Sequence, residues 1–239
     1  MAKNQGWFEA LMERTDLEAV RSGAIKYRGS EDQQMALRHT AYGEWSNDYN
    51  STFIALREST PKDDSKNWRL AQCMAYEILY TKNRYDSTVA LYAMGRFDRR
   101  EGNSPTSDYA LRLLTKELYG ATDTYYRLSY NFPHLSNEFR KAVRAADFGA
   151  EGPNVMDYFR MLVFTAHEVD SDLKTRCFLD DESLPSEEQE FRKVIRFLKR
   201  LTGAPFRVVY VGARADIVAE ETGCSVVDVD TELAALFDN

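Results

Sequence analysis

Arginines stand next to aromatic residues at several places in the chain, and this combination has a known chemistry. Bases of a single nucleic-acid strand stack on aromatic rings while guanidinium groups hold the phosphates, and neither contact requires a particular base. The pattern therefore predicts binding of single-stranded nucleic acid. The adjacent pairs are Tyr27-Arg28, Trp68-Arg69, Arg84-Tyr85, Arg96-Phe97, Tyr126-Arg127, Phe139-Arg140 and Phe159-Arg160.

Two loop-like segments concentrate these residue types. The segment RFDRREGNSP, residues 96–105, carries three arginines, and TYYRLSYNFPH, residues 124–134, carries four aromatic rings of Tyr or Phe. A third candidate is a basic ridge on a helix, formed by arginines spaced i, i+4, i+8. The candidate nucleic-acid-binding residues are Lys82, Arg84, Tyr85, Arg96, Phe97, Arg99, Arg100, Tyr126, Arg127, Tyr130, Arg140, Arg144, Arg192, Arg196 and Arg200.

An alternative explanation of these pairs needs no ligand. Neighbouring residues on a helix point about 100° apart, so a ring can belong to the core while the adjacent arginine faces solvent. The ridge of Arg192, Arg196 and Arg200 has the same alternative, a solvated helix face.

The net charge of −7 is unevenly distributed along the chain. Residues 180–190 carry six acids and no base, and residues 213–239 carry seven acids against Arg214 alone. Each of these segments has a net charge of about −6, so the rest of the chain is positive. Because local charge decides contact with phosphates, the acidic total is compatible with a nucleic-acid-binding face.

Known catalytic motifs are absent from the sequence. It lacks GxxxxGK[ST], GxSxG and HExxH, and its three histidines are scattered, so we expect a non-enzymatic protein without cofactor or metal. Its three distant cysteines favour free thiols in a reducing compartment. No run of about 18 apolar residues suggests a membrane span, and residues 1–16 do not resemble a signal peptide. We expect a cytoplasmic location, in the host cytoplasm if the protein is viral.

One set of residues offers an enzymatic alternative. The tripeptide Tyr27-Arg28-Gly29 resembles the aromatic-Arg-Gly motif of ADP-ribosyltransferases, which is followed in that family by a Ser-Thr pair and a late Glu-x-Glu. The resemblance implies NAD cleavage. In that family these elements lie on strands, whereas here the Ser-Thr pair falls in a helical register. The matching later residues are Ser51, Thr52, Glu188 and Glu190.

Capping residues and apolar spacing predict a mainly α fold, a multi-helix bundle around a single core with one short strand or hairpin near the C-terminus. We expect a helical domain over 1–203 and a small C-terminal unit over 204–239. FRVVYV, from Phe206 to Val211, is β-branched and aromatic and predicts the strand. The expected helices cover about 31–56, 64–82, 87–95, 104–118, 136–148, 153–173 and 186–201.

Two interpretations compete for residues 215–233. One is a pair of short helices resembling a helix-turn-helix; the other is strand, helix, strand, resembling a dinucleotide-binding fold with Gly212 at its turn and Asp230 at a ribose. We favour the two helices, because GARADI lacks GxGxxG and the chain ends before a sheet could be completed. Asp228, Asp230 and Glu232 would make the second helix acidic and unable to enter a DNA groove. The C-terminal unit is then a protein-docking element.

The combined interpretation is a non-enzymatic single-stranded nucleic-acid (ssDNA) binding protein. It fits a viral transcription or replication cofactor that docks a polymerase through its acidic C-terminus, since a chain without whole-length resemblance to a family favours a fast-evolving source. The main alternative is a regulator or inhibitor that acts by protein contacts through an acidic surface. The second is the ADP-ribosyltransferase-like enzyme.

Overall fold

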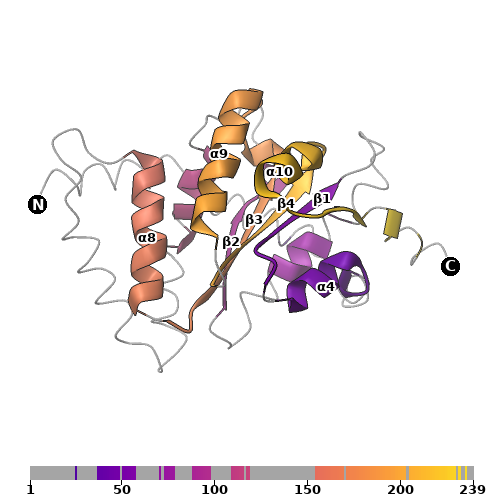
Figure 1. The fold of residues 1–239 in the computed structure, drawn as a ribbon, viewed down its shortest axis with the longest axis horizontal. Coiled ribbons are helices and arrows are strands. Elements are labelled where there is room, and N and C mark those ends of the chain that lie inside the picture. Colours follow the sequence, from indigo (N-terminus) through magenta and orange to yellow (C-terminus); the bar gives the residue numbers. More distant parts are fainter. Residues whose placement is uncertain are drawn as a thin grey trace, which may run out of the picture.

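The fold is built around a five-stranded sheet in which every neighbouring pair of strands is parallel, in the order β2-β3-β4-β1-β5 (Figure 1). The computed structural model describes residues 25, 37–48, 50–57, 70, 73–78, 88–97, 109–115, 117–118, 154–169, 171–202, 205–229, 231–232 and 235. The strands are β1 (Phe53–Arg57), β2 (Thr88–Ala93), β3 (Lys174–Asp180), β4 (Phe206–Gly212) and β5 (Val226–Asp228).

Helices pack on both faces of this sheet. Side chains alternate between the two faces along a strand. On β4, Phe206 meets Phe159 of α8, whereas the next residue, Arg207, stacks on Trp45 of α4. The helices are α4 (Ala41–Asn47), α8 (Val155–Val169), α9 (Glu188–Leu201) and α10 (Ala215–Thr222). Residues 73–78, 109–115 and 117–118 are also helical, and the 3-10 turns are η1 (Gly95–Phe97) and η2 (Asp181–Ser183).

The prediction of a mainly α bundle is wrong, and the all-α description with it: the architecture is α/β with a parallel sheet. The expected helix over 31–56 contains α4 but ends in β1, and the expected helix over 87–95 is β2. Both strands are almost wholly buried. Parallel strands buried on both faces are continuous apolar runs, so they lack the alternation that identifies a strand in sequence.

The preferred interpretation of residues 215–233 is also wrong. Residues 226–228 form strand β5 beside β1, so β4, α10 and β5 make the strand-helix-strand unit that was the alternative. Asp228 therefore ends a strand and does not lie on a recognition-like helix. The predicted strand near Phe206 is confirmed, as are helices over most of 153–173 and up to Leu201. β4 lies inside the sheet, between β1 and β3.

The connections between strands change direction next to β1. From β1 the chain crosses to β2 at the far edge, then adds β3 and β4 back towards β1. From β4 it passes to β5 on the other side of β1. β1 and β4 are thus neighbours whose following connections leave in opposite directions. Open parallel sheets bind ligands outside the carboxyl ends of such a pair of strands.

At the opposite, amino edge of the sheet, Arg207 fastens α4 to β4. Its guanidinium lies 3.9 Å from the ring centroid of Trp45 and donates to the carbonyl oxygens of Ser51 (3.0 Å), Ser46 (3.2 Å), Asp48 (2.8 Å) and Trp45. The carbonyls at a helix C-terminus lack partners within the helix and carry partial negative charge. The arginine therefore binds the C-terminal carbonyls of α4 and holds this helix against the sheet.

Candidate functional site at the carboxyl edge of the sheet

The end of β3 carries the most deeply buried carboxylate at the carboxyl edge. Asp180 is fully buried and accepts from the backbone N of Gly95 (2.8 Å), Arg96 (3.0 Å) and Ser183 (2.9 Å), and from Arg96 Nε (3.0 Å). Each carboxylate oxygen receives two donors, as a buried charge requires. Asp180 thereby joins the turn after β2 to the end of β3.

Asp181 makes the corresponding connection to β4. Its carboxylate accepts from Arg214 Nε (2.7 Å), the backbone N of Ala213 (2.7 Å) and of Arg214 (3.4 Å), and the Tyr210 hydroxyl. Burial raises the pKa of Tyr210, and the negative charge of Asp181 raises it further. The amides of 213 and 214 precede α10, so Asp181 occupies the position at this helix N-terminus where a bound anion would otherwise lie.

Glycines at the ends of β2 and β4 make these contacts possible. A Cβ on Gly212 would lie 2.4 Å from Asp181 Oδ2 and 2.6 Å from the Tyr210 hydroxyl oxygen. A Cβ on Gly95 would lie 2.5 Å from the carbonyl carbon and oxygen of Glu182. A side chain at either position would push the turn after β3 away from its neighbours.

The end of β1 carries a different kind of ion pair. Arg57, the last residue of β1, donates through Nη2 to Asp216 of α10. The two side chains are 38% and 72% exposed, whereas the buried pair of Arg96 and Asp180 is 11% and 0% exposed. In the sheet register Arg57 lies between Gly212 of β4 and Asp228 of β5.

The carboxylates and the arginine at the carboxyl edge differ in how far their hydrogen-bonding capacity is already used. Both oxygens of Asp180 and of Asp181 already accept hydrogen bonds, so neither carboxylate is placed to act as a base or as a metal ligand. Within the described ranges, no group of three or more His, Cys, Asp or Glu side chains could hold a metal ion. Among the described cations at this edge, Arg57 is the one whose bonding is most easily exchanged.

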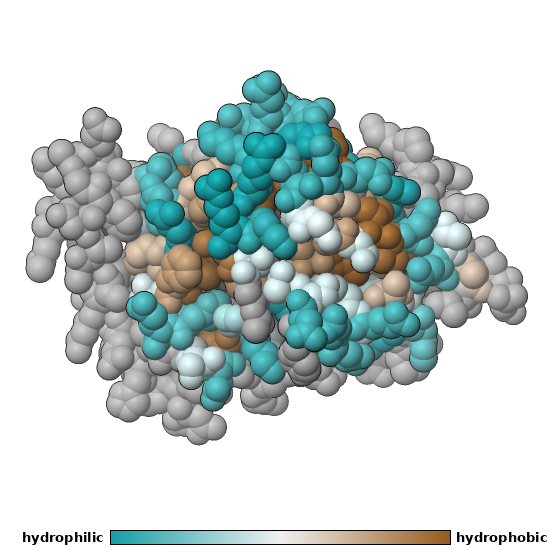
Figure 2. Space-filling view, in the orientation of Figure 1, coloured by the Kyte–Doolittle hydropathy of each residue, from teal (hydrophilic) through white to brown (hydrophobic). Residues whose placement is uncertain are grey.

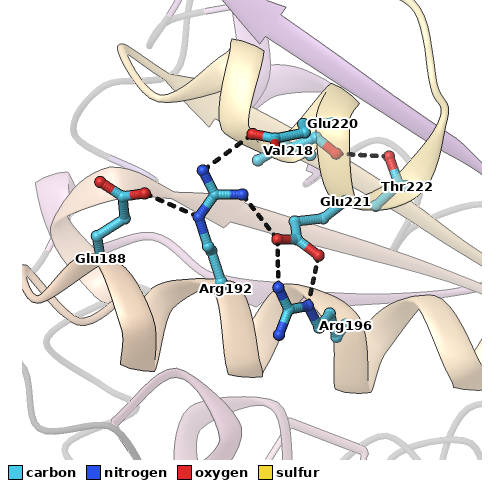
Figure 3. A network of polar contacts seen from close by, with 7 residues as sticks. All are labelled: Glu188, Arg192, Arg196, Val218, Glu220, Glu221 and Thr222. Atoms are coloured by element: carbon cyan, nitrogen blue, oxygen red, sulfur yellow. Dashed lines mark hydrogen bonds and ion pairs between the residues drawn. The ribbon is translucent and has the colours of Figure 1, made fainter.

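Two arginines of the basic ridge predicted on α9, Arg192 and Arg196, form ion pairs with glutamates of the protein itself. Arg192 donates to Glu188 (2.8 Å), Glu220 (2.9 Å) and Glu221 (2.7 Å), and Arg196 makes two hydrogen bonds to Glu221 (2.5 and 2.8 Å), as Figure 3 shows. Hydrogen bonds from Arg196 and Arg192 lower the pKa of Glu221 to about 2. These contacts join α9 to α10 at a hydrophilic part of the surface (Figure 2).

The other predicted nucleic-acid-binding residues fall into three groups. Arg96 is held by Asp180, and Arg200 is exposed in the last turn of α9. Phe97 ends η1, but its side chain is not among those described. The residues outside the described ranges are Lys82, Arg84, Tyr85, Arg99, Arg100, Tyr126, Arg127, Tyr130, Arg140 and Arg144. Binding of single-stranded nucleic acid stays a prediction from the sequence.

The ADP-ribosyltransferase-like residues are not brought together where they are described. Ser51 and Thr52 precede β1, at the amino edge of the sheet, and the Ser51 carbonyl is bound by Arg207. Glu188 begins α9, after the carboxyl end of β3, and pairs with Arg192 on the same helix. Residues 27–29 lie outside the described part of the chain.

Sequence reasoning missed Asp180, Asp181 and Arg57 as site residues. Asp180 and Asp181 were counted only as part of an acidic segment, although an apolar run ending in two acids, CFLDD at 177–181, is typical of a buried strand that ends at a functional edge. Arg57 had no such signal, because its position follows only from the order of the strands.

Comparisons with known proteins do not assign a family. No protein-family model matches the sequence, and no curated protein matches it. Among solved structures, the crystal structure of Cdc6p from Pyrobaculum aerophilum is similar at 15% sequence identity with a TM-score of 0.44, over 83% of this chain and 44% of that one. The chain thus spans less than half the length of that protein. A likeness of this degree establishes neither family nor function.

Among the described helices, none is long and apolar enough to cross a membrane.

Proposed function

We propose that the protein binds a phosphorylated small molecule, with nucleotides as the main class, at the carboxyl ends of β1 and β4. The observation that carries the proposal is the reversal of strand connections between these two neighbours. At such a point the two following connections leave in opposite directions, and ligands of open parallel sheets bind there. Because folds of this class serve many functions, the charges at the edge must select the ligand.

The charges favour an anion near β1. Arg57 ends β1, and its guanidinium is balanced by the exposed carboxylate of Asp216. A planar guanidinium binds phosphate through two parallel hydrogen bonds, which is stronger than one contact to a solvated carboxylate. Gly212, beside Arg57 in the register, has no side chain, and the space next to it holds the Asp181 carboxylate, whose charge Arg214 balances.

The proposed position of the phosphate differs from that in a dinucleotide bound at a glycine-rich turn. In that mode the pyrophosphate lies on the N-terminus of the helix that follows the first strand. In the unit of β4, α10 and β5, the amides that precede the helix, at Ala213 and Arg214, are bound by Asp181. The phosphate therefore lies towards Arg57 and Asp216, beside the first turn of α10, and not on the amides that Asp181 binds.

Calorimetric titration of the full chain with ATP, GTP, NAD⁺ and inorganic pyrophosphate tests the proposal. At least one of these compounds should bind at micromolar concentration, and adenosine, which has no phosphate, should bind far more weakly. Hydrogen exchange should slow on binding in peptides covering 53–57 and 213–222. No binding by any phosphorylated compound, or protection confined to other segments, would refute the proposal.

A further inference from the structure

We infer that Arg57 recognises the phosphate and that Asp216 competes with the ligand for the same guanidinium. This inference rests on the proposed function and assigns the residues of that site. In the unliganded protein Asp216 occupies Arg57, and binding exchanges this carboxylate for a phosphate.

The first support is the contrast among the arginines at this edge. Arg96 is held by a fully buried carboxylate, and Arg214 donates to Asp181 and to the Pro185 carbonyl (2.6 Å) while stacking on Phe191. Removing either from its partners would leave buried groups unpaired, which is costly. Arg57 instead pairs with an exposed carboxylate, and such pairs contribute little to stability.

The second support is the bonding of the guanidinium. Within the described ranges Asp216 is the polar partner of the Arg57 side chain, through Nη2 alone. Arginine offers five donors, so most of its capacity is unused in this contact. A phosphate can use two of them at once and carries more negative charge than a carboxylate.

The third support is the asymmetry of the neighbouring strands. Asp228, in register with Arg57 on β5, would repel a phosphate, and one of its oxygens accepts from the backbone N of Thr231 (3.2 Å). On the β4 side, Gly212 has no side chain, and the Asp181 carboxylate beside it is balanced by Arg214 (2.7 Å). A phosphate on Arg57 is therefore repelled less on the β4 side, which is also the side of the strand reversal.

A simpler role for Asp216 makes a different prediction. Acids in the first turn of a helix stabilise its dipole, and Asp216 is in the first turn of α10. In that case Asp216→Asn would lower stability slightly and leave ligand affinity unchanged. If Asp216 competes for Arg57, the same substitution should raise affinity.

The test measures dissociation constants for inorganic pyrophosphate and for ATP with the variants Arg57→Gln, Asp216→Asn and the double variant. Arg57→Gln should weaken binding at least about tenfold, the size expected for loss of a charge-assisted pair. Asp216→Asn should tighten binding several-fold in the native background but not in the Arg57→Gln background, because its effect acts through the guanidinium. Binding of pyrophosphate shows that the anion alone is recognised, whereas binding of ATP only shows that the nucleoside is also required.

The matched control is another exposed pair, Arg160 and Asp157 on α8, whose side chains are 55% and 45% exposed. Arg160→Gln and Asp157→Asn should leave both dissociation constants unchanged. Melting temperatures identify any variant that fails to fold; Arg57→Lys, which keeps the charge but not the two-point geometry, then replaces Arg57→Gln and should give intermediate affinity.

The possible results separate this inference from the proposed function. If the native chain binds a phosphorylated probe but Arg57 and Asp216 variants bind it equally well, this inference is overturned and the proposed function stands. If the native chain binds no phosphorylated probe, both are overturned.

Discussion

Asp180 and Asp181 are adjacent in the sequence, yet their carboxylates bind the ends of two different strands. Asp180 accepts from the turn after β2, and Asp181 accepts from the turn after β4. Asp180 is the last residue of β3 and Asp181 is the first residue of η2. Because β3 lies between β2 and β4, the two acids can reach the turns that follow both flanking strands. Three of the four strand ends that surround the candidate site are thereby fixed relative to one another.

Asp180→Asn should destabilise the protein by about 3 kcal/mol or more, the range for breaking a buried ion pair. The substitution keeps the shape but removes the charge that balances Arg96, and its amide group would face backbone N–H donors. Unfolding in urea, followed by circular dichroism, measures the loss. Glu187→Gln, at an exposed position whose side chain makes no capping hydrogen bond to α9, is the control and should change little; equal effects of the two would show that Asp180 has no special role.

Arg207→Lys should cost about 2 to 3 kcal/mol despite retaining the positive charge, because lysine cannot bind several carbonyls in one plane. The guanidinium donates to four backbone carbonyl oxygens around the end of α4. Urea unfolding gives the free energy, and Trp45 beneath the guanidinium offers a fluorescence signal. Arg200→Lys, on the exposed end of α9, should be nearly neutral. A neutral Arg207→Lys would mean that the carbonyls find other partners.

The contacts between α9 and α10 should weaken in acid. Arg196 and Arg192 lower the pKa of Glu221 to about 2, so the ionised carboxylate is favoured in the folded state. A depressed pKa contributes stability that is present above the unfolded value, near 4.5, and is lost as pH falls towards 2. The difference in unfolding free energy between the native chain and Glu221→Gln should therefore be largest above pH 5 and shrink below pH 4.

The control for this pH dependence is Glu168→Gln, at an exposed position on α8. Its unfolding free energy should follow that of the native chain at every pH. A difference for Glu221→Gln that stays constant between pH 5 and pH 3 would show that charge at this position does not contribute.

Sequence reasoning identified those helices and strands whose residue pattern lies within the element itself. α9 has acids in its first turn, bases in its last and one apolar side, and β4 is β-branched, so both were recognised. β1 and β2 fall within predicted helices, because a buried run of five or six apolar residues also fits the apolar side of a helix. The partners of Arg192 lie 28 and 29 positions away, on α10, and no spacing within α9 reveals them. The candidate site depends on strand order, which is fixed by tertiary packing.

At Gly212 the backbone of β4 lies close to the Asp181 carboxylate. A Cβ at this position would lie 2.4 Å from Asp181 Oδ2, so Gly212→Ala must displace the carboxylate and its bonds to Arg214 and Tyr210. We expect a loss of about 1 to 3 kcal/mol from the overpacking. Gly223→Ala is the matched control: its φ of 71° makes alanine unfavourable, by about 1 kcal/mol, but no atom lies within 4 Å of the added Cβ.

The two glycine variants should differ in a second measurement, the effect of removing Asp181. When Asp181→Gly is added, much of the cost of Gly212→Ala should disappear, because the clash with the carboxylate and the displaced bonds no longer exist, while the Tyr210 hydroxyl still meets the added Cβ. The cost of Gly223→Ala should be unchanged in the same background, because its origin is backbone conformation and distant sites are additive. If Gly212→Ala costs the same with and without the carboxylate, Asp181 does not determine the conformation of this turn, and the anion position at the start of α10 is open to a ligand.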